Sequence, residues 1–213
     1  MAILNNGLSG NNKGKIGNLV YYESMGKNVV RRIGVNLNPP SPAQVNSRSQ
    51  MSLISGFLKA SLEYINAGFG AEALSQNRIP FNMAVSANKP NAVSGVFPDI
   101  VIDYSKAVMS IGTLKPAQNP LAVLGATGLQ FSWFTEPDML WPELSDQVML
   151  LAYFPELKKA VFRLYGPERI AGEAFLPIGG AMLDQPMETY LSFVSADRKQ
   201  ASESVYTGGF NAI

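Results

Sequence analysis

The chain has 213 residues, of which 46% are hydrophobic and 15% are charged, and its formal net charge is +1. It contains neither cysteine nor histidine, so disulfides, thiolate nucleophiles, imidazole bases and Cys/His zinc sites are excluded, and we expect no cofactor. The charge is unevenly distributed, because residues 1–50 carry six basic residues and one acidic residue, a net charge of +5, whereas the rest of the chain carries −4.

The N-terminal residues 1–13 are small and polar, and we expect them to form a flexible arm. This segment lacks the basic and apolar regions of a signal peptide. No apolar run in the chain has the length that a membrane span needs. We therefore expect a protein that is made in the cytoplasm and has no membrane span.

Residues 15–35 are predicted to form a β-hairpin. Its strands are KIGNLVYY (residues 15–22) and NVVRRIGV (residues 28–35), and Gly26 in the turn can adopt a positive φ. Alternation gives the hairpin apolar side chains on both faces, and an isolated ribbon of this kind is only marginally stable in water. We therefore expect it to dock on its own body or on another molecule. The expected contact residues are Ile16, Leu19, Val20, Tyr21, Tyr22, Val29, Val30, Arg31 and Arg32.

A long helix is predicted after the hairpin. The prolines of NPPSPAQ force an extended approach, and Ser41 and the residues after it match a capping box with proline at the first helical position. Apolar residues recur at helical spacing to about Asn66, and we expect Gly68 and Gly70 to end the helix. A weaker helical pattern covers residues 76–90.

The C-terminal part is predicted to be all-β. Residues 99–114 are expected to form a strand pair or a bulged strand, and residues 115–120 a linker. From about Leu124, apolar segments recur between turns that carry Pro, Gly, Asp or Glu, which is typical of an antiparallel sandwich. Trp133 is the expected core residue between the sheets. The segment VMLLAYF (residues 148–154) is apolar on both faces, as a central strand should be.

Two groups of carboxylates are candidates for chemistry. Asp99 and Asp103 would share one face of a regular strand, either as edge or turn carboxylates or as a paired acid and base. The second group lies in a segment with two prolines that lacks the register of a calcium loop, so it is either a solvated acidic loop or a weak cation site. This second group is Glu136, Asp138, Glu143 and Asp146.

The basic residues of the hairpin allow a function in nucleic-acid binding. Tyr21 and Tyr22 could stack on bases while the neighbouring cations neutralise phosphates. Alternatively, the tyrosines pack and the cations protect an exposed strand edge from unwanted pairing. Sequence-independent nucleic-acid binding is therefore the alternative function. The residues concerned are Lys13, Lys15, Lys27, Arg31 and Arg32.

The preferred interpretation is assembly without enzymatic activity. A loose arm, a hairpin that is apolar on both faces and a weakly charged surface suit strand or arm exchange between subunits. Opposite charges on the arm and the body would orient the contact. We expect a structural or interaction protein that forms homo-oligomers, or that decorates a larger particle beside other structural proteins, through its N-terminal hairpin.

Several motifs carry a resemblance to known sequences. They are, in chain order, NNGLSG, GKIGNLVYY, GKNVVRR, NPPSPAQ, INAGF, IDYSK and SESVYTGG. Over essentially the whole chain they resemble an uncharacterised family of proteins of similar length encoded in Bacteroidota. Residues 1–50 also resemble a shorter module of phage-encoded proteins of suspected virion function. The family has no assigned activity, and the resemblance implies a structural role in a virion or phage-like particle.

These observations predict an α+β protein with two parts. Residues 1–120 are expected to form an α+β region that consists of the flexible arm, the β-hairpin and the long helix. Residues 124–213 are expected to form an all-β immunoglobulin/fibronectin-like sandwich. No catalytic, cofactor-binding or metal-ligating residue is assigned, and the expected site is the N-terminal hairpin.

Overall fold

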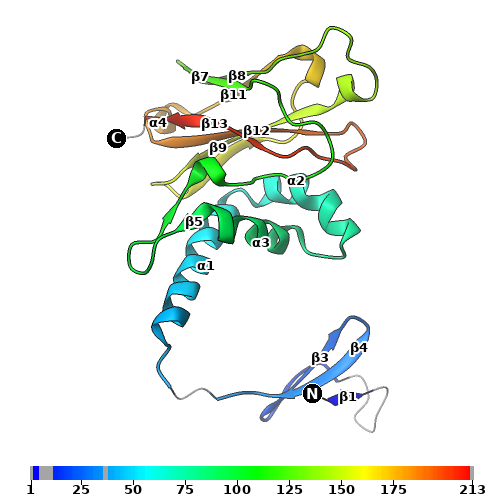
Figure 1. The fold of residues 1–213 in the computed structure, drawn as a ribbon, viewed down its shortest axis with the longest axis vertical. Coiled ribbons are helices and arrows are strands. Elements are labelled where there is room, and N and C mark those ends of the chain that lie inside the picture. The colour runs from blue at the N-terminus through cyan, green and yellow to red at the C-terminus, as the bar shows by residue number, and fades with distance from the viewer. Residues whose placement is uncertain (1, 5–11, 36–37, 212–213) are drawn as a thin grey trace. The chain divides into compact units, whose positions relative to one another are not determined.

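The computed structural model describes residues 2–4, 12–35 and 38–211. The chain divides into two compact units, Met1–Ser41 and Pro42–Ile213 (Figure 1). This division differs from the ranges 1–120 and 124–213 expected from the sequence. The reason is that the helices after Ser41 pack on the C-terminal strands and share a core with them.

The N-terminal unit is a four-stranded antiparallel sheet. Its strands are β1 (Ala2–Leu4), β2 (Gly14–Ile16), β3 (Leu19–Ser24) and β4 (Lys27–Arg32). Their spatial order is β1-β4-β3-β2. The turn between β3 and β4 contains Met25 and Gly26, which have φ values of 51° and 72°, as the central residues of a type I′ hairpin require.

Two predictions for the N-terminal unit are corrected. Residues 15–22 are not one strand, because the chain turns at Gly17, which has a φ of 58°. The expected flexible arm contributes β1, which pairs with β4; the other arm residues 1 and 5–11 lie outside the described residues. The expected hairpin is therefore the centre of a larger sheet.

The second unit begins with three helices, α1 (Pro42–Ala60), α2 (Leu62–Ser75) and α3 (Pro80–Ala92). The start of α1 at Pro42 and the position of α3 confirm the sequence patterns. The long helix is interrupted at Ser61, however, whose backbone angles are not helical. Gly68 and Gly70 lie inside α2 and do not end a helix. A Cβ at Gly68 would lie 2.7 Å from the Cβ of Ser110, so glycine is needed there for close packing.

Two antiparallel sheets make up most of the remainder. The strands are β7 (Leu121–Gly125), β8 (Gly128–Ser132), β9 (Gln147–Phe154), β10 (Lys159–Arg163), β11 (Glu173–Pro177), β12 (Met187–Val194) and β13 (Val205–Phe210). One sheet has the order β11-β8-β7 and the other β10-β9-β12-β13. The short elements are β5 (Val93–Ser94), β6 (Val101–Ile102), η1 (Tyr104–Lys106), η2 (Glu143–Ser145), η3 (Arg169–Ala171) and α4 (Gly180–Leu183).

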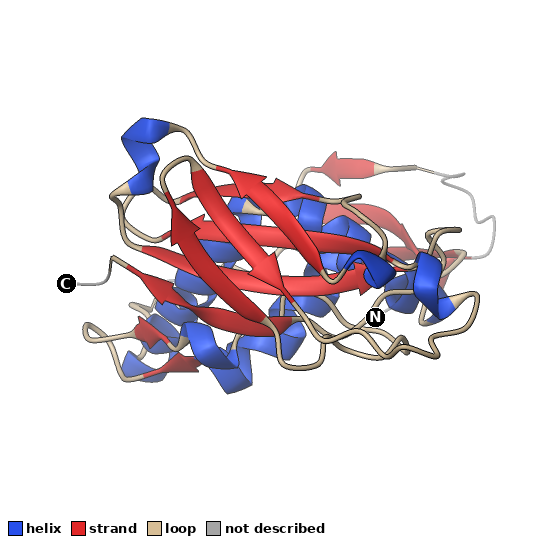
Figure 2. Ribbon diagram, turned by 90° about the horizontal axis from the view of Figure 1, so that it is seen from above, coloured by secondary structure: helices blue, strands red, loops and turns tan. Residues whose placement is uncertain are grey.

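The second unit has three layers. The helices cover one face of the four-stranded sheet and the three-stranded sheet covers the other, as seen from the side in Figure 1 and from above in Figure 2. Alternate residues of β9 serve the two cores: Met149 and Leu151 face the helices, whereas Leu150 packs against the other sheet. This burial confirms the central strand. Trp133 is 6% exposed and packs edge-on against Phe193 between the sheets, which confirms its predicted place.

The segment before the two C-terminal sheets differs from its prediction. Of the residues 99–114, only Val101–Ile102 form a strand. Side chains replace the missing strand ladder, because the Asn88 amide donates to the Val108 carbonyl at 2.7 Å and accepts from the Val108 amide at 2.7 Å. Residues 115–120 are not a free linker, since their backbone accepts hydrogen bonds from Phe134 and Arg169. None of the helices among the described residues is long and apolar enough to cross a membrane.

Candidate interaction surfaces

The pairing register separates the predicted contact residues onto two faces of the N-terminal sheet. Directly opposed residues of an antiparallel pair share a face, and successive residues of one strand alternate. One face carries Lys15, Val20, Tyr22, Lys27, Val29 and Arg31, and the opposite face carries Ile16, Leu19, Tyr21, Val30 and Arg32. The structure therefore brings these residues into one sheet but does not place them on one surface.

The first face, which we call the basic face, carries the cations Lys15, Lys27 and Arg31. All three are exposed, and the described positions of this face hold no acidic residue. The Arg31 guanidinium lies 6.0 Å from the centre of the Tyr22 ring, at the limit of a cation–π contact. This face is therefore a compact cationic surface with one aromatic ring.

The second face, which we call the apolar face, is half-buried at Leu19, Tyr21 and Val30, and Ile16 at its edge is 55% exposed. Beside this face, Lys13 forms an exposed ion pair with Glu23 at 2.8 Å. Lys13 lowers the pKa of the Glu23 carboxyl through this hydrogen bond and its charge. Lys13 therefore belongs to an ion pair beside the apolar face, whereas the sequence analysis predicted it to be one of the cations that bind nucleic acid.

A second surface lies where the loops of the two C-terminal sheets meet. Four segments, which precede β7 or connect β8 to β9, β10 to β11 and β12 to β13, converge at one end of the sheets. We call them the loop end, and they are residues 113–118, 133–146, 164–172 and 195–204. Backbone hydrogen bonds connect them, because Leu114 donates to the Ala201 carbonyl at 3.0 Å, Phe134 donates to the Gln118 carbonyl at 2.9 Å and Arg169 donates to the Asp146 carbonyl at 2.6 Å. The loop end is therefore a connected surface.

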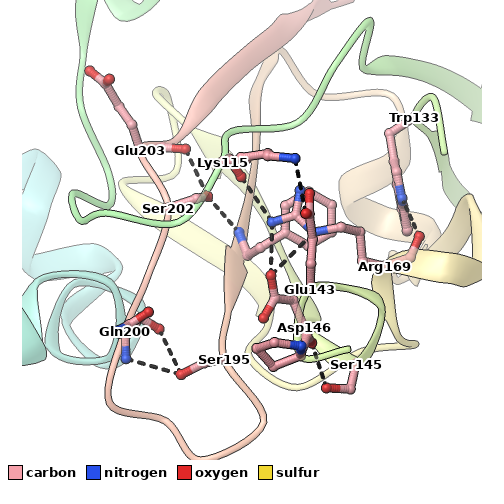
Figure 3. Close-up of polar contacts among 12 residues, drawn as sticks. Lys115, Trp133, Glu143, Ser145, Asp146, Arg169, Ser195, Gln200, Ser202 and Glu203 are labelled. Carbon is pink, nitrogen blue, oxygen red and sulfur yellow. Dashed lines mark hydrogen bonds and ion pairs between the residues drawn. The ribbon is translucent and has the colours of Figure 1, made fainter. Parts of the chain in front are cut away.

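A buried ion pair occupies the centre of the loop end (Figure 3). The Arg169 guanidinium donates to Asp146 Oδ2 from Nε at 3.2 Å and from Nη2 at 3.0 Å, and it also donates to the Lys115 carbonyl at 2.9 Å. Its other side lies 3.8 Å from the centre of the Phe193 ring. Burial raises the pKa of the Asp146 carboxyl, and the Arg169 charge opposes this rise. One side chain thereby links three of the four loops.

An open cleft of about 520 Å³ lies beside this ion pair. Trp141 lines the cleft and is 77% exposed. Glu143, which also lines it, accepts a hydrogen bond from the Lys115 ammonium at 2.9 Å. Asp197, from the loop of residues 195–204, also lines the cleft and accepts a hydrogen bond from the Ser195 hydroxyl at 2.6 Å. The cleft thus combines an exposed indole with carboxylates whose positions are fixed by neighbours.

The carboxylates singled out in the sequence have separate roles. Asp146 is not in a solvated loop, because its side chain is 3% exposed and paired with Arg169. Asp99 and Asp103 do not share a strand, and Asp103 instead pairs with Lys106 at 2.7 Å. No cluster of three or more His, Cys, Asp or Glu that could hold a metal ion occurs among the residues that the structure describes.

Sequence reasoning missed Arg169 and Trp141. Arg169 is separated from Asp146 by 23 positions, and no periodic pattern marks it as buried. Trp141 carried no clear signal either, because a single exposed apolar residue is normal at a protein surface. The acidic residues around it predict a solvated loop or a weak cation site instead.

The fold and these two surfaces define a mixed α+β protein in which a small cationic sheet precedes helices packed on antiparallel sheets. The chain belongs to the family of unknown function DUF6266, which matches residues 11–208. This match confirms the predicted membership of an uncharacterised family. No curated protein and no solved structure matches the chain.

Proposed function

We propose that this protein is a non-enzymatic structural or interaction protein that assembles through its N-terminal sheet. The assembly that it forms is a homo-oligomer, or a layer of copies that decorates a larger particle such as a phage or phage-like virion. The sequence supports the non-enzymatic role, because thiolate nucleophiles and imidazole bases are missing and an enzyme would have to work with carboxylates, Lys, Tyr or Ser alone.

One observation carries the proposal: in the part of the N-terminal sheet whose burial is described, residues 12–35, apolar side chains are exposed or half-buried and almost none is buried. Of the residues 12–35, Val29 is the one buried residue, although this segment contains nine Val, Leu, Ile and Tyr side chains. A small sheet needs a covered apolar face to be stable in water. A partner that covers the face of Ile16, Leu19, Tyr21 and Val30 supplies this cover.

We further propose that the C-terminal strands form an immunoglobulin-like sandwich. In chain order, strands one, two and five of the seven form one sheet and strands three, four, six and seven the other. The two sheets enclose a core that contains Trp133. Such sandwiches expose loops at their ends and are common as modules of binding and surface proteins, which supports a role in assembly.

Static light scattering at two protein concentrations tests the assembly. We expect the wild-type mass to increase with concentration, and we expect Ile16→Lys to abolish this increase because it places a charge on the apolar face. Val35→Lys is the matched control, since Val35 is 80% exposed and lies outside the strands. A wild-type protein that stays monomeric at high concentration would refute the proposal.

Sequence-independent nucleic-acid binding is the second candidate. The clustering of Lys15, Lys27 and Arg31 on one face beside Tyr22 favours it, because cations and an aromatic ring together bind single strands. Three phosphate contacts give affinity that falls steeply with salt. A salt titration of single-stranded and duplex DNA binding with wild type and Lys15→Glu tests this function. The absence of retention at low ionic strength excludes it.

A further inference from the structure

The two surfaces described above have opposite charges. The N-terminal unit, residues 1–41, carries five basic residues and one acidic residue, a net charge of +4. The second unit carries twelve basic and fifteen acidic residues, a net charge of −3. The four segments of the loop end alone hold seven acidic and four basic residues. The negative balance of the second unit is therefore concentrated at the loop end.

The cleft of the loop end has the chemistry to receive a cation that is attached to an apolar group. The exposed indole of Trp141 offers the best ring for a cation–π contact and also attracts thioethers. Glu143 and Asp197 supply negative charge from two different loops, and the Lys199 ammonium lies 4.0 Å from Asp197 Oδ2. Lys115 also lines the cleft, but its ammonium is paired with Glu143 at 2.9 Å.

The tip of the β3–β4 hairpin carries the complementary groups. Met25, at the first position of the turn, is 93% exposed, so a long thioether side chain projects into solvent. Lys27 follows two residues later on the basic face, and Arg31 lies further along the same face. The turn is narrow because it has two residues, and it presents an apolar group and cations together.

We propose that the hairpin tip of one molecule binds the loop-end cleft of a second molecule, with Met25 against Trp141 and Lys27 between Glu143 and Asp197. This inference rests on the proposed assembly and names its second surface. The contact is heterologous, since the tip of one copy meets the cleft of the next. It therefore builds chains or rings and leaves one free tip and one free cleft on every open chain.

Two variants test the cleft and the hairpin tip independently. Trp141→Ala removes the ring from the cleft at an exposed position. The double variant Met25→Asn, Lys27→Glu alters the tip, and asparagine suits the positive φ of this position, so the turn is kept. Lys59→Glu is the control, because it changes the charge by the same amount as Lys27→Glu on the exposed side of α1.

Light scattering and sedimentation of each variant, alone and mixed in equal amounts, test the inference. We expect Trp141→Ala and the tip variant each to weaken association about tenfold or more, and Lys59→Glu to behave as wild type. The mixture is decisive, because the intact tip of Trp141→Ala fits the intact cleft of the tip variant. We expect the mixture to associate more strongly than either variant alone, because the tip–cleft contact can form once in each pair of unlike molecules.

The outcomes distinguish this inference from the proposed function. Unchanged association of Trp141→Ala, together with dissociation of Ile16→Lys, overturns the cleft contact and leaves assembly through the N-terminal sheet in place. Loss of association in both variants without complementation in the mixture also overturns it. A wild-type protein that is monomeric at every concentration removes both proposals.

Discussion

Replacing Arg169 by methionine should strongly destabilise the second unit. The side chains of Arg169 and Asp146 are 5% and 3% exposed, so the variant leaves a carboxylate in the interior without its counter-charge. It also leaves the Lys115 carbonyl without the donor that Arg169 supplies at 2.9 Å. Methionine fills much of the volume that the arginine occupies against Phe193. The loss of stability in this variant therefore reports the missing polar contacts more than the creation of a cavity.

The expected size follows from the burial of the pair. Removing one partner of a buried ion pair costs about 3–5 kcal/mol of unfolding free energy. Replacing both partners, as in Arg169→Met with Asp146→Leu, removes the lone charge and should recover all but about 1–3 kcal/mol, the cost of the unpaired Lys115 carbonyl. The control is Lys115→Met, which breaks a solvent-screened ion pair with Glu143 and should change the stability far less than Arg169→Met.

Urea unfolding followed by tryptophan fluorescence measures these differences. Both tryptophans, Trp133 and Trp141, lie in the second unit, so the signal reports this unit alone. The pH gives a second readout. In Arg169→Met the lone Asp146 takes up a proton more readily in the folded than in the unfolded state, so the variant gains stability as the pH falls towards the ordinary pKa of aspartate, and its deficit against wild type shrinks.

Two results would refute this reasoning. One is a loss in Arg169→Met that equals the loss in Lys115→Met, because burial would then have no influence on the cost of breaking the pair. The other is a double variant that is as unstable as Arg169→Met alone. The lone carboxylate would then not be the source of the destabilisation.

Three further predictions concern positions where packing determines the residue. Gly68→Ala should lower stability by about 1–3 kcal/mol through its contact with Ser110, whereas Gly70→Ala, with open space around it, should not; urea midpoints of the two variants check this. Asn88→Ala leaves both backbone groups of Val108 without their amide partner and should cost about 1–3 kcal/mol in the same assay. Burial raises the pKa of Tyr64 far above its usual value and that of Tyr104 to about 12, so the folded state keeps protons that the unfolded state loses near pH 10; stability should fall as the pH rises above 10, and absorbance at 295 nm should show phenols that titrate only on unfolding.

Elements with strong local patterns could be predicted from the sequence. β9 is apolar on both faces because both of its faces are buried, and a strand of this kind can be recognised from residues 148–154 alone. The turn at Met25 and Gly26 was predicted from the glycine, and the positive φ of Gly26 confirms it. In both places the residue type follows from the local backbone or burial of the same segment, so the segment's own sequence is sufficient to predict it.

Other elements depend on contacts that a single sequence does not display. β7 lies in the stretch Pro116–Thr135, which contains no charged residue, so the strand has no polar face to mark its period. Leu121 and Val123 are exposed although they are apolar. The sequence predicts a helix end at Gly68, but glycine is needed there because Ser110 packs closely against it. Ser110 lies 42 positions away in the sequence, so no local pattern indicates this contact. Tertiary packing decided these positions, and local propensity did not.

The loop end explains why a chain with few charges buries two of them together. Three carbonyls meet there that no strand ladder can pair: the Lys115 carbonyl accepts from the Arg169 side chain, the Asp146 carbonyl from the Arg169 amide at 2.6 Å, and the Arg169 carbonyl from the Trp133 indole at 2.8 Å. An apolar side chain at position 169 would keep the two contacts of the backbone but would leave the Lys115 carbonyl and the Asp146 carboxylate without their donor. Arginine has five N–H donors in a fixed plane and satisfies several acceptors at once. The buried pair therefore fixes the loop positions, and the geometry of the cleft beside Trp141 depends on it.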